Sequence, residues 1–185
     1  MKKIFTILTL SLLSSAYAQH SIMIVNNYST NFDFQGKIGA HNFAGSCFPY
    51  VTSSTPTSII VPADSHQGNG KELAYKNFKD QYTSSLYPTT NWTLQTSATN
   101  SSVRSWNHPS IAPGGVISYN VKWASSQFQM YYAGTSTPEP GFSGQIGESP
   151  DPCTGAPGYI STPYGDAEWF NITTANVTYS YLQIY

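Results

Sequence analysis

The side chains that could do acid–base or nucleophilic chemistry are few in this chain and lie far apart in the sequence. Hydrolysis of a glycosidic bond needs two facing carboxylates. Only Asp33, Asp166 and Glu168 fall on or beside segments with strand character, and they form no closely spaced acidic cluster. A serine nucleophile is expected on a G-x-S-x-G turn, a motif that the chain lacks. The sequence therefore predicts no catalytic residue and favours a protein that is not an enzyme.

Histidine offers one alternative chemistry that stays open. Signal-peptide cleavage one residue beyond the favoured site would make His20 the mature N-terminus. An N-terminal histidine can chelate Cu²⁺ through its α-amine and its ring, and a second histidine such as His108 would complete the site. This arrangement defines the copper-dependent polysaccharide monooxygenases, and His41 or His66 could also supply the second ring. Cleavage before Gln19 would let that glutamine cyclise and remove the amine, so the sequence predicts no metal and no cofactor.

The two cysteines, Cys47 and Cys153, are predicted to form a disulfide, because this is the usual state of a cysteine pair in an exported chain. For so long a loop, the chain-entropy model gives about 4–5 kcal/mol of stabilisation. No histidine lies in an activating motif beside either cysteine, which argues against a catalytic thiol. A zinc site would need more cysteines or histidines at close spacing in the sequence.

Ligand binding is the chemistry that the aromatic residues favour. Trp106 and His108 lie in a segment expected to be a loop between strands, close to Arg104. An exposed Trp ring can stack on the apolar face of a sugar while its polar neighbours bond the hydroxyl groups. The other tryptophans are expected in the core, on the apolar faces of strands: Trp92, Trp123 and Trp169. The predicted ligand-binding residues are therefore Arg104, Trp106 and His108.

The first residues have the pattern of a secretory signal peptide. Lys2 and Lys3 precede a short apolar stretch, and Ala16-Tyr17-Ala18 matches an Ala-x-Ala cleavage site. The apolar stretch is about half as long as a helix that spans a bilayer, so no transmembrane segment is expected. We predict a signal peptide over residues 1–18, a secreted location and a single β-sandwich domain over residues 19–185.

Charge and composition limit the partners. Eight basic and nine acidic residues give a formal net charge of −1, which provides no electrostatic basis for binding nucleic acid. Only 9% of the residues are charged, against about 25% in an average globular domain. Aromatic residues make up 15%, which indicates a packed core rather than disorder. A glycan or a cell-surface protein is the partner that such a surface favours.

Alternation of apolar and polar residues predicts that most of the chain forms strands. Residues 21–26 and 31–38 are predicted to form one hairpin, and residues 116–123 and 127–132 a second. Further strands are expected at residues 57–61, 92–96, 168–172 and 175–185.

Two segments depart from this pattern. Residues 70–80 place Leu73, Ala74 and Phe78 at roughly helical spacing and predict a short helix or an ordered loop. Residues 134–165 are so rich in glycine and proline that they predict a long loop, which the disulfide would tie to the Cys47 region.

The elements together predict an all-β fold: a single antiparallel β-sandwich with one disulfide and a short helix near residues 70–80. The expected function is that of a secreted, non-enzymatic module that binds a glycan or a protein, or of an extracellular structural subunit. The copper enzyme is one alternative. A membrane-active β-sandwich, suggested by the fourteen tyrosines, is another. The oligomeric state is left open.

Overall fold

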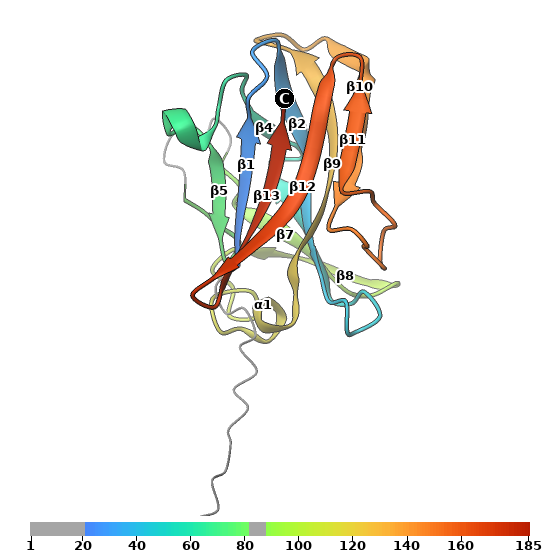
Figure 1. The fold of residues 1–185 in the computed structure, drawn as a ribbon. Coiled ribbons are helices and arrows are strands. Elements are labelled where there is room, and N and C mark those ends of the chain that lie inside the picture. Colours follow the sequence, from blue (N-terminus) through green and yellow to red (C-terminus); the bar gives the residue numbers. More distant parts are fainter. Residues whose placement is uncertain (1–20, 82–87) are drawn as a thin grey trace, which may run out of the picture.

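A computed structural model describes residues 21–81 and 88–185, and these residues form two β-sheets that face each other (Figure 1). Buried apolar side chains from both sheets meet between them, so the described part of the chain is a β-sandwich. The fold class predicted from the sequence is thereby confirmed. In the described ranges, no helix is long and apolar enough to cross a membrane.

The first sheet, sheet A, has the strand order β11-β12-β13-β1-β5-β6. Its strands are β1 (Ser21–Asn27), β5 (Leu73–Lys76), β6 (Lys79–Asp80), β11 (Tyr159–Thr162), β12 (Gly165–Thr174) and β13 (Val177–Ile184). The second, sheet B, has the order β10-β9-β2-β3-β7-β8, and β4 also pairs with β2. Its strands are β2 (Phe32–His41), β3 (Tyr50–Thr55), β4 (Ile59–Val61), β7 (Asn91–Ser97), β8 (Asn100–Ser105), β9 (Lys122–Tyr132) and β10 (Pro138–Gly147).

Most neighbouring strands are antiparallel, but the first and last strands of the chain are not. β1 runs parallel to β13, with Ser21 opposite Thr178 and Asn27 opposite Ile184. Because β1 belongs to sheet A and β2 to sheet B, the predicted hairpin of residues 21–26 and 31–38 is wrong. Both segments are strands, but the connection between them carries the chain from one sheet to the other.

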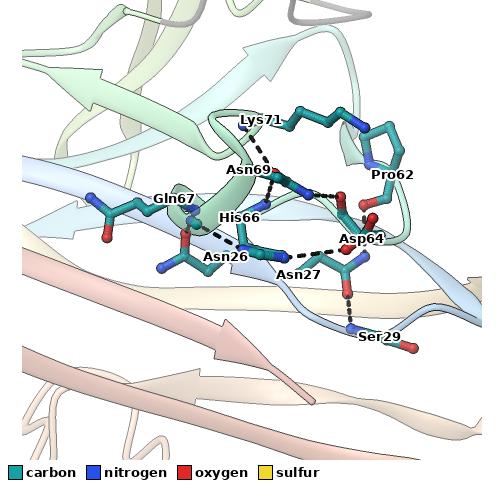
Figure 2. A network of polar contacts seen from close by, with 10 residues as sticks. Asn26, Asn27, Ser29, Pro62, Asp64, His66, Gln67, Asn69 and Lys71 are labelled. Carbon is teal, nitrogen blue, oxygen red and sulfur yellow. Dashed lines mark hydrogen bonds and ion pairs between the residues drawn. The ribbon is translucent and has the colours of Figure 1, made fainter.

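A buried side chain holds this crossing between the sheets (Figure 2). The Asn27 amide is fully buried and donates to the backbone carbonyl of Phe32 at 2.8 Å. The same nitrogen lies 3.2 and 3.0 Å from the carbonyls of Val61 and Pro62. Its own carbonyl oxygen accepts the N–H of Ser29 at 3.2 Å. In a hairpin, these backbone groups would be paired between the two strands, but here the side chain of one asparagine bonds them. The strand can therefore end without a tight turn.

The prediction of a short helix near residues 70–80 is wrong, because β5 and β6 form a tight hairpin there. Leu73 and Tyr75 point into the core and alternate with less buried residues, as in any half-buried strand. Asn77 and Phe78 at the turn have φ values of 48° and 67°. Two successive residues in the left-handed region cannot continue a right-handed helix.

The one α-helix of the described residues is α1 (Val116–Asn120), in a segment predicted to be a strand. The Ser118 hydroxyl donates to the carbonyl of Ala112 at 2.7 Å, and Val116 and Tyr119 remain exposed, so the alternation there does not reflect a buried face. β9 then runs without a break, so the second predicted hairpin is also wrong. Residues 124–126, which resemble a turn in sequence, are small residues buried in the middle of a sheet.

The glycine- and proline-rich segment contains two strands, β10 and β11, in place of the single long loop that was predicted. β10 lies at an edge of sheet B, where its prolines need not donate to a second neighbour. The register with β9 also shifts between Pro138 and Ser143, which absorbs the irregular residues in a bulge. The connection between β10 and β11, residues 148–158, remains a loop and carries Cys153.

The core between the sheets is aromatic. Trp92 and Trp123 of sheet B lie 5.6 Å apart between ring centroids, and Tyr75 of sheet A packs on both of them. Trp169 is also buried. The prediction that Trp92, Trp123 and Trp169 fill the core is confirmed.

Candidate functional site

The outer face of sheet B carries a row of amide side chains that the strand register brings together. Phe128 and Met130 of β9 point into the core, so Gln127 and Gln129, which alternate with them, point outward. Gln127 pairs with Lys37 of β2 on one side and with Gln145 of β10 on the other. Three neighbouring strands therefore place long polar side chains side by side.

A second row continues the same surface one step along the strands. Gln129 pairs with Gln35 of β2 and with Ser143 of β10. The two rows line an open groove of about 520 Å³, with Ser58 at its border. We call it the amide groove, and its side chains are Gln35, Lys37, Ser58, Gln127, Gln129, Ser143 and Gln145.

Most of the groove's polar groups have no partner among the residues that the structure describes. The side chains of Gln35, Lys37, Gln127 and Gln145 make no hydrogen bond to any described residue. Gln129 differs, because its amide nitrogen donates to the carbonyls of Met130 and Glu139 at 2.9 and 2.6 Å and so secures the bulged edge strand. The groove thus offers free amide donors and acceptors and one free ammonium group, all on a rigid sheet.

The predicted ligand-binding residues lie elsewhere, at and just beyond the end of β8. Arg104 donates to the carbonyl of its neighbour Val103 at 3.2 Å, and the His108 ring lies 2.8 Å from the hydroxyl of Ser110. No hydrogen bond or ring contact joins Arg104, Trp106 and His108 to one another in the described structure. Each of the three side chains is instead engaged with its own surroundings.

Trp106 is half-buried and packs against the core. The Nζ atom of Lys79 lies 4.9 Å from the centre of its ring, within the range of a cation–π contact. The two residues share a small pocket of about 140 Å³ with Lys76, Gln81 and Pro113. A sugar that stacked on this face of the indole would have to displace the lysine.

The other histidines are also placed by the fold, except for His20, which lies outside the described residues. His66 caps the 3₁₀ helix η1 (Gln67–Asn69): its Nδ1 accepts the N–H of Gly68, and its Nε2 lies 3.2 Å from Asp64 (Figure 2). His66 is therefore used in local structure. The copper alternative remains a prediction for the untested N-terminus.

A second polar cluster lies under the disulfide, at the end of β2. His41 is 2% exposed, and its Nε2 lies 3.2 Å from the hydroxyl of Ser125. The ring of Tyr50 packs edge-on against the imidazole at 4.3 Å. Asp151, on the loop after β10, is 4% exposed and also belongs to this cluster. Ser125 is only 4% exposed, so its contact with His41 does not present a nucleophile to solvent.

The disulfide positions the loop that covers the cluster. Cys47 and Cys153 are bonded, as predicted from the sequence. On one side, Asn42 accepts the N–H groups of Gly45 and Cys47 and shapes the turn after β2. On the other, the Asp151 carboxylate accepts the N–H groups of Cys153 and Thr154 at 2.8 and 3.2 Å. The bond thus joins two compact turns over His41.

Because His41 is buried, its protonation makes the stability of the folded protein depend on pH. Desolvation lowers the pKa of His41 below its usual 6.5, and the charge of Asp151 offsets this only in part. Below about pH 6.5 the unfolded chain takes up a proton that the folded state refuses, so stability is full above that pH and falls below it. We expect the urea midpoint of H41Q to change less than that of the wild type between about pH 7.5 and about pH 5.5.

The control for this effect is H108Q, because His108 lies in the turn after β8, where its ring contacts Ser110, and is only partly buried. This variant should keep the wild-type pH dependence. An unchanged dependence in H41Q would show that the buried imidazole does not titrate differently on unfolding.

Sequence reasoning missed both clusters, for different reasons. The amide groove had a local signal, the alternation of Gln127 and Gln129 with buried residues, but nothing in the sequence aligned β9 with β2 and β10. The cluster of His41 and Asp151 had no local signal, because its members come from distant parts of the chain. Comparisons with protein-family models, curated proteins and solved structures found no match.

Proposed function

We propose that this protein is an extracellular, non-enzymatic binding module that holds a glycan in the amide groove. The observation that carries the proposal is a set of side chains in register across β2, β9 and β10 that have no hydrogen-bond partner in the described part of the chain: Gln35, Lys37, Gln127 and Gln145. The backbone of these strands is already ordered by the sheet, so only the side chains have to lose freedom when a ligand binds.

The chemistry of the groove suits a hydroxyl-rich ligand. Each glutamine amide both donates and accepts, as a sugar hydroxyl does, so neighbouring amides can bond neighbouring hydroxyl groups. Among the described residues, Lys37 is the only charged side chain that lines the groove, which suits neither a nucleic acid backbone nor a strongly charged protein surface. The volume of about 520 Å³ is within the range of small-ligand sites.

The disulfide supports the extracellular part of the proposal. Such bonds persist in oxidising compartments and are rare in the cytosol. The low proportion of charged residues, 9%, also leaves amides and hydroxyls as the main polar groups of the surface.

The test begins with purified protein on a glycan array, followed by titration calorimetry with the ligand that binds best. The variant Q35A/Q127A/Q145A is expected to bind this ligand about 100-fold more weakly, since each lost hydrogen bond contributes about 1 kcal/mol. These side chains make no internal hydrogen bond to the described residues, so the melting temperature should stay unchanged.

The matched control is Q183A, which removes a partly buried glutamine from β13 of sheet A. It should bind like the wild type. Binding that survives the triple variant, or an array without any bound glycan, would refute the proposal.

A further inference from the structure

We propose that the cluster under the disulfide is a latent zinc site, formed by His41, Asp151, Cys47 and Cys153 when the disulfide is reduced. The inference does not depend on the amide groove. It rests on how closely four side chains of metal-ligating type converge.

The geometry already approximates a ligand set. A ring nitrogen of His41, a carboxylate oxygen of Asp151 and the Sγ atom of Cys153 all lie within 4.8 Å of one another. The Sγ atom of Cys47 lies one bond length, 2.17 Å, from that of Cys153 and so borders the same group of atoms. In a tetrahedral zinc site with bonds of about 2.0–2.3 Å, ligand atoms are about 3.5 Å apart. Shifts of about 1 Å per ligand would therefore close the site.

The two ligands outside the disulfide are incompletely bonded in the structure. The Nδ1 atom of His41 is buried and has no hydrogen-bond partner among residues 21–81 and 88–185. An orphaned ring nitrogen in a 2% exposed side chain is costly, and a metal would satisfy it.

Asp151 contributes an uncompensated charge. Its carboxylate is 4% exposed and forms no salt bridge with any described cation. Its partners are the N–H groups of Cys153 and Thr154 and the Thr154 hydroxyl, which orient the carboxylate and leave lone pairs free. A buried anion of this kind gains from a divalent cation.

The disulfide determines when the site can form. With the bond closed, neither sulfur is a thiolate, and the remaining histidine and carboxylate are too few for a structural zinc site. A reductant, for example two thiols that leave as their own disulfide, supplies two electrons and two protons and gives two cysteine thiols. Zn²⁺ then replaces the two thiol protons, which pass to water, and binds two thiolates, the imidazole and the carboxylate.

Zinc is the metal that fits this set. Mixed sulfur, nitrogen and oxygen ligands in tetrahedral array favour Zn²⁺ over the hard cations, which prefer oxygen alone. A cleft of about 560 Å³ leads from solvent to His41 and is bordered by Phe43, Tyr119 and Lys122. This cleft provides an entry path for the ion.

The test measures Zn²⁺ binding by equilibrium dialysis before and after reduction with a phosphine, with circular dichroism to confirm that the sheets persist. The reduced wild type is expected to bind one Zn²⁺ and the oxidised protein at least about 100-fold more weakly, since loss of even a second-shell group costs about 10–100-fold. Co²⁺ in place of zinc should give thiolate charge-transfer bands only after reduction.

Two variants test whether His41 and Asp151 bind zinc together with the two cysteines, or whether the two thiols bind it alone. Reduced H41A and D151N should each bind Zn²⁺ at least about tenfold more weakly than the reduced wild type. H108A, which removes a histidine that bonds Ser110, should bind like the wild type. Equal affinity in H41A, or zinc binding only by a reduced chain that has lost its sheets, would overturn the proposal.

Discussion

Replacing both cysteines by alanine, C47A/C153A, is expected to lower the free energy of unfolding by about 4–5 kcal/mol. The bond joins residues separated by 106 positions, so without it the unfolded chain regains the entropy of a very long open loop. The loss is a large share of the stability of a typical domain, which is about 5–15 kcal/mol. Urea unfolding followed by tryptophan fluorescence measures it.

The wild type reduced in the absence of metal is the control for this variant, because it lacks the bond but keeps both side chains. The two proteins should unfold at the same urea concentration. A loss below about 1 kcal/mol in both would mean that residual structure in the unfolded chain already restricts the loop.

The second large effect is expected in the aromatic core, where W92A should cost about 3–5 kcal/mol. Trp92 is fully buried and contacts the rings of Tyr75, Phe78 and Trp123. Its Nε1 also donates to the carbonyl of Phe78 at 2.9 Å, and this carbonyl lies at the turn between β5 and β6. Alanine would leave a cavity between the sheets and an unpaired carbonyl at once. Chemical denaturation measures the loss.

A pair of phenylalanine variants separates packing from hydrogen bonding. Trp169 is buried too, but its Nε1 has no hydrogen-bond partner in the described structure. W92F should therefore cost more than W169F, by about the 1–3 kcal/mol that an orphaned carbonyl costs. Equal losses in the two variants would show that the bond to Phe78 adds nothing, and this comparison still works if W92A fails to fold.

Local sequence patterns predicted the strands well where one face is buried. Residues 31–38 and 92–96 correspond to β2 and β7, because alternation along a strand follows directly from which side chains face the core. Residues 21–26 form β1, as their continuous apolar run predicts for a strand buried on both faces. The same reasoning failed at Val116–Asn120, where the alternating residues are on a short exposed helix. It failed again at residues 70–80, where a hairpin and a helix place similar residues at similar spacing.

Strand neighbours could not be predicted in this way. β1 pairs with β13 from the other end of the chain, and β2 pairs with β9, so neither forms the hairpin that sequence proximity suggests. The two polar clusters depend on these same pairings. Gln127 meets Lys37 and Gln145 only because β9 lies between β2 and β10.

The sequence by itself determined the β-rich character, the tryptophan core and the disulfide, because each follows from residue type or from spacing along one strand. Only the tertiary structure decided which strands are neighbours, where the single α-helix of the described chain lies, and which polar side chains converge. Convergence is a property of contacts between residues such as His41 and Asp151, whose separation in the sequence carries no record of their distance in space. The chemistry proposed for this protein, at the amide groove and under the disulfide, follows from those long-range contacts.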